Sequence, residues 1–296
     1  MTEQKAPAGF LNILKPPGMS SHDIVGAVRR VLHTKKVGHA GTLDPGAAGV
    51  LPVAVGPATR LIEYLEHADK SYRAEMQLGY TTASGDDLSP VTERLATFTM
   101  PTAEQVKAVL PRFMGRITQT PSAYSAIKIN GQRACDRMRQ GEQVEMSSRE
   151  VVIHRLELLA CRTADHTLLL DVDCSRGTYI RSLCTDLGQA LGIPAVMTFL
   201  VRTRVGDFRL ADALTLEELA EKGATALLPP AQMLSLPRYD LRPDRAKAFC
   251  NGLSTSDWHV KSLPAAFTVY ADGQFLGIGT WDAAQREVKA VKVYRV

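Results

Sequence analysis

The chain has 296 residues, a length that favours one large domain with a small one beside it. Hydrophobic residues make up 45% and charged residues 22%, proportions that allow a full globular core. No apolar run approaches the roughly 18 residues of a membrane span, and residues 1–9 lack the apolar stretch of a signal peptide. We therefore expect a cytoplasmic protein.

The number and spacing of the cysteines also fit a cytoplasmic protein. The five cysteines are odd in number and far apart, and no C-x-x-C pair occurs. This pattern predicts neither a disulfide framework nor a zinc site. The cysteines are Cys135, Cys161, Cys174, Cys184 and Cys250.

The net charge of +4 is unevenly distributed. Residues 1–60 carry seven basic side chains against three acidic ones, and residues 112–149 carry the same numbers, so each segment has an excess of +4. Local basic faces on a nearly neutral protein fit a polyanionic partner. Taken alone this signal is weak, because most basic clusters are simply solvated.

The chain begins with an alternating segment, Phe10 to Lys15, which predicts a strand. Two prolines and Gly18 then form a rigid turn, and Ser20 or Ser21 caps a helix. The apolar face of this helix consists of Ile24, Val28, Val31 and Leu32. Lys15 either contacts the loop described next or is a solvated turn residue.

Residues 37–56 organise the rest of the chain. They hold five glycines and two prolines and then run into an apolar strand, Leu51 to Val55. Asp44 lies in the middle, followed by Pro45, which favours an extended backbone at the aspartate. A rigid loop that presents one acid suits catalysis on a large substrate. The alternative is that Asp44 caps a short helix with Pro45 at its first position.

The middle of the chain contains both helical and extended patterns. Residues 59–65 predict a short helix, and residues 72–78 alternate as a half-buried strand. Residues 81–95 are polar and are expected to form a loop. Thr102 to Gln105 form a capping box for a helix that ends at Phe113.

Further along, Asn130-Gly131 predicts a hairpin turn. Residues 151–160 and 167–174 predict two more strands. A helix starting near Ile180 is stopped by Gly192, and residues 196–209 predict one long strand.

The C-terminal part has a different pattern. Thr215 caps another helix, and the proline-rich residues 227–237 mark the best domain boundary. Residues 242–251 look helical. The short strands that follow suggest a small β-barrel, and they are residues 267–271, 275–281 and 288–294, with a hairpin turn at Asp272-Gly273.

Three motifs carry a resemblance to a known family. Residues 38–46, Gly-His-Ala-Gly-Thr-Leu-Asp-Pro-Gly, resemble the signature of the TruB-type tRNA pseudouridine synthases. Residues 115–128 and 174–181 are similar to two further motifs of that family, and the likeness covers nearly the whole chain. The chain departs from the family pattern at Ser122, Cys135, Met138 and Val201.

The resemblance implies an α/β (α+β) fold. Residues 1–236 would form the pseudouridine synthase catalytic domain, with a mixed, largely antiparallel central sheet flanked by helices. Residues 115–149 would form a basic flap over the RNA, in which Cys135 and Met138 change the packing but not the charge. Residues 237–296 would form a PUA-like RNA-binding β-barrel.

The resemblance also implies a site. Its catalytic residues would be Asp44, Arg181 and Tyr72, and its substrate-binding residues His39, Tyr72, Tyr179 and Leu200. Arg181 would pair with Asp44, Tyr72 would stack on the uracil, and His39 would replace the flipped base in the RNA. Without the family, Tyr72 reads more readily as a core strand residue and Arg181 as a surface arginine.

The activity implied is isomerisation of uridine 55 in the T loop of tRNA to pseudouridine, after base flipping. This redox-neutral reaction needs no cofactor or metal, and we expect a monomer without an obligatory protein partner. Two alternatives remain: a non-catalytic tRNA-binding or RNA-chaperone protein, and a guide-directed pseudouridine synthase within a larger particle.

Overall fold

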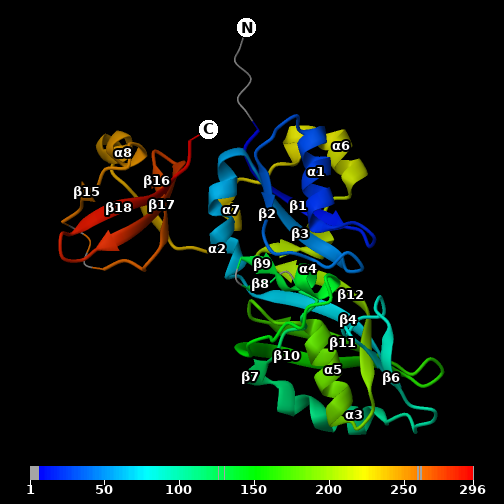
Figure 1. The fold of residues 1–296 in the computed structure, drawn as a ribbon. Coiled ribbons are helices and arrows are strands. Elements are labelled where there is room, and N and C mark those ends of the chain that lie inside the picture. The colour runs from blue at the N-terminus through cyan, green and yellow to red at the C-terminus, as the bar shows by residue number, and fades with distance from the viewer. Residues whose placement is uncertain (1–6, 126, 130, 259, 261, 296) are drawn as a thin grey trace.

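The structure is a computed structural model that describes residues 7–125, 127–129, 131–258, 260 and 262–295. Within these residues the largest element is a nine-stranded sheet (Figure 1). Its strands are β1 Gly9–Lys15, β2 Val37–His39, β3 Ala48–Val55, β4 Lys70–Leu78, β7 Gly115–Gln119, β10 Arg149–Arg162, β11 Thr167–Cys174, β12 Ala195–Val205 and β13 Phe208–Arg209.

Seven of these strands cross the sheet in the order β1-β3-β12-β4-β11-β10-β7, while β2 pairs with β3 and β13 pairs with β12. The β3–β12 pair is parallel and the other pairs are antiparallel. The predicted mixed, largely antiparallel sheet is therefore confirmed. Every residue of β3 is buried, as expected for an apolar strand covered on both faces.

Helices cover the sheet at several places. The helices are α1 Ser21–Val31, α2 Ile62–Glu66, α3 Ala103–Val109, α4 Ala134–Arg139, α5 Ile180–Ala190, α6 Leu216–Lys222, α7 Pro230–Met233 and α8 Pro243–Cys250, with 3-10 segments η1 Gly56–Leu61, η2 Leu110–Phe113, η3 Leu210–Asp212 and η4 Gly223–Ala226. Of the two candidate caps of α1, Ser20 is the one used, in a capping box with Asp23. Among the described residues, no helix is long and apolar enough to cross a membrane.

The structure corrects two predictions about extended segments. The predicted polar loop 81–95 contains a hairpin of β5 Tyr80–Thr82 and β6 Val91–Arg94. All four residues of β6 are exposed, so the strand lacks the apolar alternation that would have marked it. The predicted strand 196–209 is split, because Gly206 turns the chain between β12 and β13 with a φ of 53°.

The flap forms a second, smaller layer. Its strands β8 Lys128–Ile129 and β9 Gln132–Arg133 make a hairpin that leads into α4. Asn130 of the predicted turn lies outside the described residues. Cys135 and Met138, which differ from the family pattern, are both half-buried.

The C-terminal strands form a separate five-stranded sheet, seen beside α2 in Figure 1. Its strands are β14 Arg238–Asp240, β15 Thr255–Ser256, β16 Phe267–Ala271, β17 Gln274–Asp282 and β18 Glu287–Val293. Ile278 of β17 is fully buried in one apolar cluster with Phe10, Leu61 and Phe208 of the larger part. The two parts therefore share a hydrophobic core across the predicted boundary.

Gly49 allows β3 to approach β12 closely, and we expect Gly49→Ala to destabilise the protein strongly. Its φ is 113°, and an added Cβ would lie 2.2 Å from the carbonyl oxygen of Arg202. Backbone strain and overpacking together should lower the free energy of unfolding by about 3 kcal/mol or more, measured by urea denaturation. Gly192→Ala is the control, because Gly192 also has a positive φ, 72°, but open space around it. Equal losses in the two variants would contradict the close approach.

Candidate active site

Asp44 lies in the connection between β2 and β3, here called the Asp44 loop (residues 40–47). No helix begins at Pro45, so the helix-cap alternative is wrong. Instead the Ala47 N–H donates to the Asp44 carbonyl over 3.1 Å, which closes a tight turn. The loop is thus a turn between two paired strands, with its acid at the bend.

Side chains from the N-terminal segment hold the second half of this loop. The Ser21 hydroxyl accepts from the Leu43 N–H over 2.9 Å and donates to the Leu43 carbonyl over 3.2 Å. The Lys15 ammonium and the Gly18 N–H both donate to the Pro45 carbonyl, over 3.2 and 2.8 Å. Lys15 is 0% exposed, so the contacting alternative for this lysine is the observed one.

Arg202 holds the first half of the loop. Its guanidinium donates to the carbonyls of Val50, Gly41 and Thr42 over 2.8, 3.0 and 3.4 Å. The residue is 1% exposed, so these carbonyls have few alternatives in water. Sequence reasoning considered Val201 and missed Arg202. The available signal was the two-residue period of a strand, which places Arg202 on the same face as Leu200.

Arg181, the second residue of α5, forms the predicted pair with Asp44. Its Nε lies 3.2 Å from the Asp44 carboxylate, and its Nη1 lies 3.4 Å from Asp86. The remaining donors bind the Ser84 and Tyr124 carbonyls over 3.1 and 3.0 Å. Each of the three guanidinium nitrogens thus has a contact, in a geometry that lysine cannot reproduce.

The two members of this pair differ in exposure. The Arg181 side chain is 5% exposed and that of Asp44 is 44% exposed. In the described part of the chain, Arg181 is the one ion-pair partner of Asp44. A buried cation thus holds a carboxylate whose outer side faces an open space.

That open space is a cavity of about 280 Å³, here called the Asp44 cavity. It is lined by Gly41, Thr42, Leu43, Asp44, Glu66, Lys70, Tyr72, Ser125, Arg176, Gly177, Thr178, Tyr179, Ile180, Arg181, Leu200 and Arg202. Five of the six predicted site residues line this one cavity, although they come from four distant segments. His39 does not line it and lies on β2 instead.

Two tyrosines form the aromatic part of the cavity. Tyr72 on β4 is 8% exposed, and burial raises its pKa to about 12, so its phenol stays neutral at physiological pH. Tyr179 precedes α5, and the Gln119 side chain bonds both its N–H and its carbonyl, over 3.0 and 3.3 Å. The Arg149 guanidinium lies 5.0 Å from the centroid of the Tyr179 ring, a cation–π contact that links the end of the flap to the cavity.

Lys70 and Ser125 are two further polar residues of the cavity that the sequence did not predict. The Lys70 ammonium donates to the Ala68 carbonyl over 2.9 Å, and burial lowers its pKa to about 8. The Ser125 hydroxyl is buried without a hydrogen-bond partner among the described residues. Both groups can therefore offer hydrogen bonds to a bound molecule.

His39 is held in a different environment. Its Nδ1 is buried and has no partner in the described part of the chain. Burial, with a smaller contribution from Arg202, lowers the pKa of the imidazole, which favours the neutral ring. Among the described residues, no group of three or more His, Cys, Asp or Glu side chains is placed to bind a metal ion.

Solved structures share this fold. The chain resembles Cbf5 in a Cbf5-Nop10-Gar1 complex with a TM-score of 0.74 and 26% identity, over 99% of this chain and 86% of the other. It resembles the archaeal box H/ACA sRNP Nop10-Cbf5 complex with a TM-score of 0.70 and 25% identity, over 100% and 88% of the two chains. The match extends over both parts of the molecule.

Sequence comparison defines the class as pseudouridylate synthase. A model of the TruB family pseudouridylate synthase N-terminal domain matches residues 29–180, and a model of the tRNA pseudouridylate synthase B C-terminal domain matches residues 181–234. The chain belongs to the TruB family of pseudouridylate synthases.

Three relatives are each named tRNA pseudouridine synthase B. The protein of Symbiobacterium thermophilum is 48% identical over 83% of this chain and 82% of its own length. That of Heliobacterium modesticaldum is 41% identical over 96% and 89%, and that of Mycobacterium tuberculosis is 44% identical over 91% of each.

We expect Arg181→Lys to reduce turnover much more than RNA binding. The lysine keeps the charge but loses the fork that bonds Asp44, Asp86 and two carbonyls. The rate at saturating RNA should fall about 100-fold, and Arg181→Met should be worse because a buried partner is removed. Single-turnover kinetics measure the rate. Near-wild-type rates for Arg181→Met would end the ion-pair proposal.

We expect Arg202→Lys to loosen the Asp44 loop. One ammonium cannot reach three carbonyls in the arrangement that the guanidinium does, so a buried acceptor loses its donor. The free energy of unfolding should fall by about 1–3 kcal/mol, and loop amides should exchange hydrogen faster. Arg204→Lys is the matched control on the same strand, because Arg204 bonds Ser71 and Gly206 instead. Unchanged exchange in Arg202→Lys would contradict this role.

Proposed function

We propose that this protein converts uridine to pseudouridine at position 55, in the T loop of tRNA. The observation that carries the proposal is the partly exposed Asp44 carboxylate, held by buried Arg181 at an aromatic and apolar cavity. The names of the relatives, tRNA pseudouridine synthase B, support the substrate.

The reaction breaks the N1–C1′ bond of uridine, rotates the base and joins C5 to C1′. C5 loses a proton and N1 gains one, so atoms and electrons balance without an oxidant or reductant. A carboxylate can serve this exchange by attacking C1′ or by taking a proton from the ribose. Asp44 is the acid that we assign to either step, and the ion pair with Arg181 holds its carboxylate in position.

The cavity walls suit a flipped base. A uracil removed from the RNA stack needs a flat apolar partner, and such stacking contributes ~1–3 kcal/mol. Tyr72 and Leu200 provide that surface, and Tyr179 lies beside it. In this proposal His39, near the start of the Asp44 loop, enters the space that the base leaves in the T loop.

The flap and the C-terminal sheet bind the rest of the RNA in this proposal. The basic side chains of the flap contact phosphates, which position the RNA without reading its sequence. The C-terminal residues 237–296 act as the PUA-like RNA-binding domain, and residues 1–236 carry out the chemistry. The protein acts in the cytoplasm.

We propose that the protein acts as a monomer without an obligatory protein partner. All proposed catalytic side chains come from one chain, and the Asp44 cavity is closed on its inner side by that chain. Purified protein should therefore modify a tRNA transcript when no other protein or guide RNA is present. Binding without turnover would instead support an RNA-chaperone role.

Asp44→Asn should abolish detectable pseudouridine formation, a loss on the order of 10⁴-fold or more. The amide keeps the size of the side chain but removes the charge needed for attack or proton removal. Affinity for tRNA should stay near that of the wild type, because phosphate contacts lie elsewhere. A tritium-release assay measures turnover and filter binding measures affinity. Appreciable turnover by this variant would reject Asp44 as the catalyst.

A further inference from the structure

A basic groove lies where the C-terminal sheet meets the larger part of the molecule, here called the junction groove. It has a volume of about 410 Å³ and is distinct from the Asp44 cavity. Three of its eight lining residues are cationic and none is acidic. The eight lining residues are Lys36, Pro57, Arg60, Cys250, Asn251, Gly252, Val293 and Arg295.

The three cations come from three distant segments of the chain. Lys36 precedes β2, Arg60 lies in η1, and Arg295 follows β18. The Gly56 N–H donates to the Lys36 carbonyl over 2.8 Å, which fixes the backbone of Lys36 against the start of η1. The Arg295 guanidinium donates to the Cys250 carbonyl and to the Asn251 side chain. Three cations from separate segments therefore meet at one groove, whereas the charges of a solvated helix face all come from a single element.

The positive charge of the groove is not neutralised by the protein. Among the described residues, neither Lys36 nor Arg60 has an ion-pair partner, and both side chains are exposed. Glu63, one turn beyond Arg60, is bound to Lys292 over 2.9 Å. Two free cations and a third, hydrogen-bonded one therefore face the same space.

The groove is also preformed. The Glu63–Lys292 pair joins α2 to β18 beside it. The buried Ile278 packs in one cluster with Leu61, which follows Arg60 directly. Because both walls belong to one packed core, a bound anion would not have to bring the cations together.

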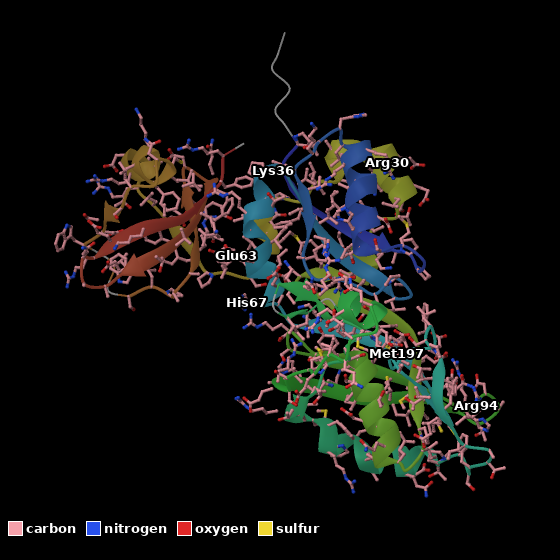
Figure 2. The ribbon with its side chains drawn as sticks, in the orientation of Figure 1. Arg30, Lys36, Glu63, His67, Arg94 and Met197 are labelled. Carbon is pink, nitrogen blue, oxygen red and sulfur yellow. The ribbon has the colours of Figure 1, made fainter. Side chains whose placement is uncertain are left out.

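One segment connects the groove to the Asp44 cavity. Pro57 lines the groove and Glu66 lines the cavity, and the two are nine positions apart along η1 and α2. At 1.5–2 Å per residue this corresponds to roughly 15 Å. Figure 2 shows Lys36, Glu63 and His67 in a row along the edge that faces the C-terminal sheet. A polyanion seated at the cavity can therefore continue into the groove.

We propose that the junction groove binds the phosphodiester backbone of the tRNA at a segment outside the T loop. Lys36 and Arg60 supply charges without base recognition, so the contact adds affinity and orientation but no sequence preference. The inference depends on the proposed function for the identity of the RNA. It assigns the groove a role in holding the substrate and none in the chemistry.

The test compares two RNAs with two double variants of the full chain. Lys36→Gln/Arg60→Gln removes two groove cations, and Arg30→Gln/Arg94→Gln removes the same charge at exposed sites away from the groove (Figure 2). The RNAs are whole tRNA and a minimal hairpin of the T loop with a shortened stem. Dissociation constants are measured over a range of salt concentrations, and thermal melting checks folding.

The groove variant should bind whole tRNA about tenfold more weakly, and the salt slope of its affinity should fall by about 2. Its binding of the minimal hairpin, and its rate at saturating RNA, should match the wild type. The control variant should resemble the wild type with both RNAs. Equal weakening with both RNAs, no weakening with either, or equal weakening in the control would overturn the proposal.

Footprinting of tRNA phosphates on the wild-type protein provides a second measurement, which does not depend on a variant. Protection confined to the T loop and its stem would also overturn the groove contact. The two proposals fail separately. If the wild-type protein makes pseudouridine but the groove variant binds tRNA normally, the proposed function stands and the groove contact is rejected. If the wild-type protein makes no pseudouridine, the proposed function is rejected, and the binding comparison still tests the groove contact.

Discussion

The Asp44–Arg181 ion pair lies at the boundary between the protein interior and an open cavity. A buried cation is costly unless it is paired and hydrogen-bonded, and Arg181 has ion pairs with Asp44 and Asp86 and hydrogen bonds to two carbonyls. One of those carbonyls belongs to Tyr124 at the base of the flap. The ion pair therefore ties together the Asp44 loop, helix α5 and the flap.

The pair can hold its geometry only if the Asp44 loop is equally restrained. Five consecutive residues, 41–45, each have a backbone group bonded from elsewhere or within the turn. The donors come from β1, from the turn that follows it, from α1, from β12 and, for Asp44, from Ala47 of the loop itself. Such restraint suits catalysis, in which a displacement of about 1 Å can reduce the rate about 100-fold. A glycine-rich loop is thus restrained mainly by groups that lie outside it.

The sequence predicted what depends on local patterns and on complete motifs. The capping boxes at Thr102 and Thr215 and the buried strand β3 follow from short-range chemistry, whereas the choice between Ser20 and Ser21 as cap of α1 was left to the structure. The motifs grouped Asp44 with Arg181. Arg202 was missed, because the period of the strand gives the face on which it lies but not the distant carbonyls that it binds. The exposed strand β6 was missed because neither face is apolar. Hydrogen bonds between distant residues and pairs of solvent-exposed strands leave no periodic pattern in the sequence.

The shared core of the two sheets has a consequence for how the chain folds during synthesis. Phe10 leaves the ribosome long before Ile278, which packs in the same cluster. The cluster around β1 therefore stays incomplete until residue 278 has been made. Domains that emerge early usually fold early. Until Ile278 has been made, part of the apolar surface of β1 stays uncovered. A chaperone could protect that surface during this period.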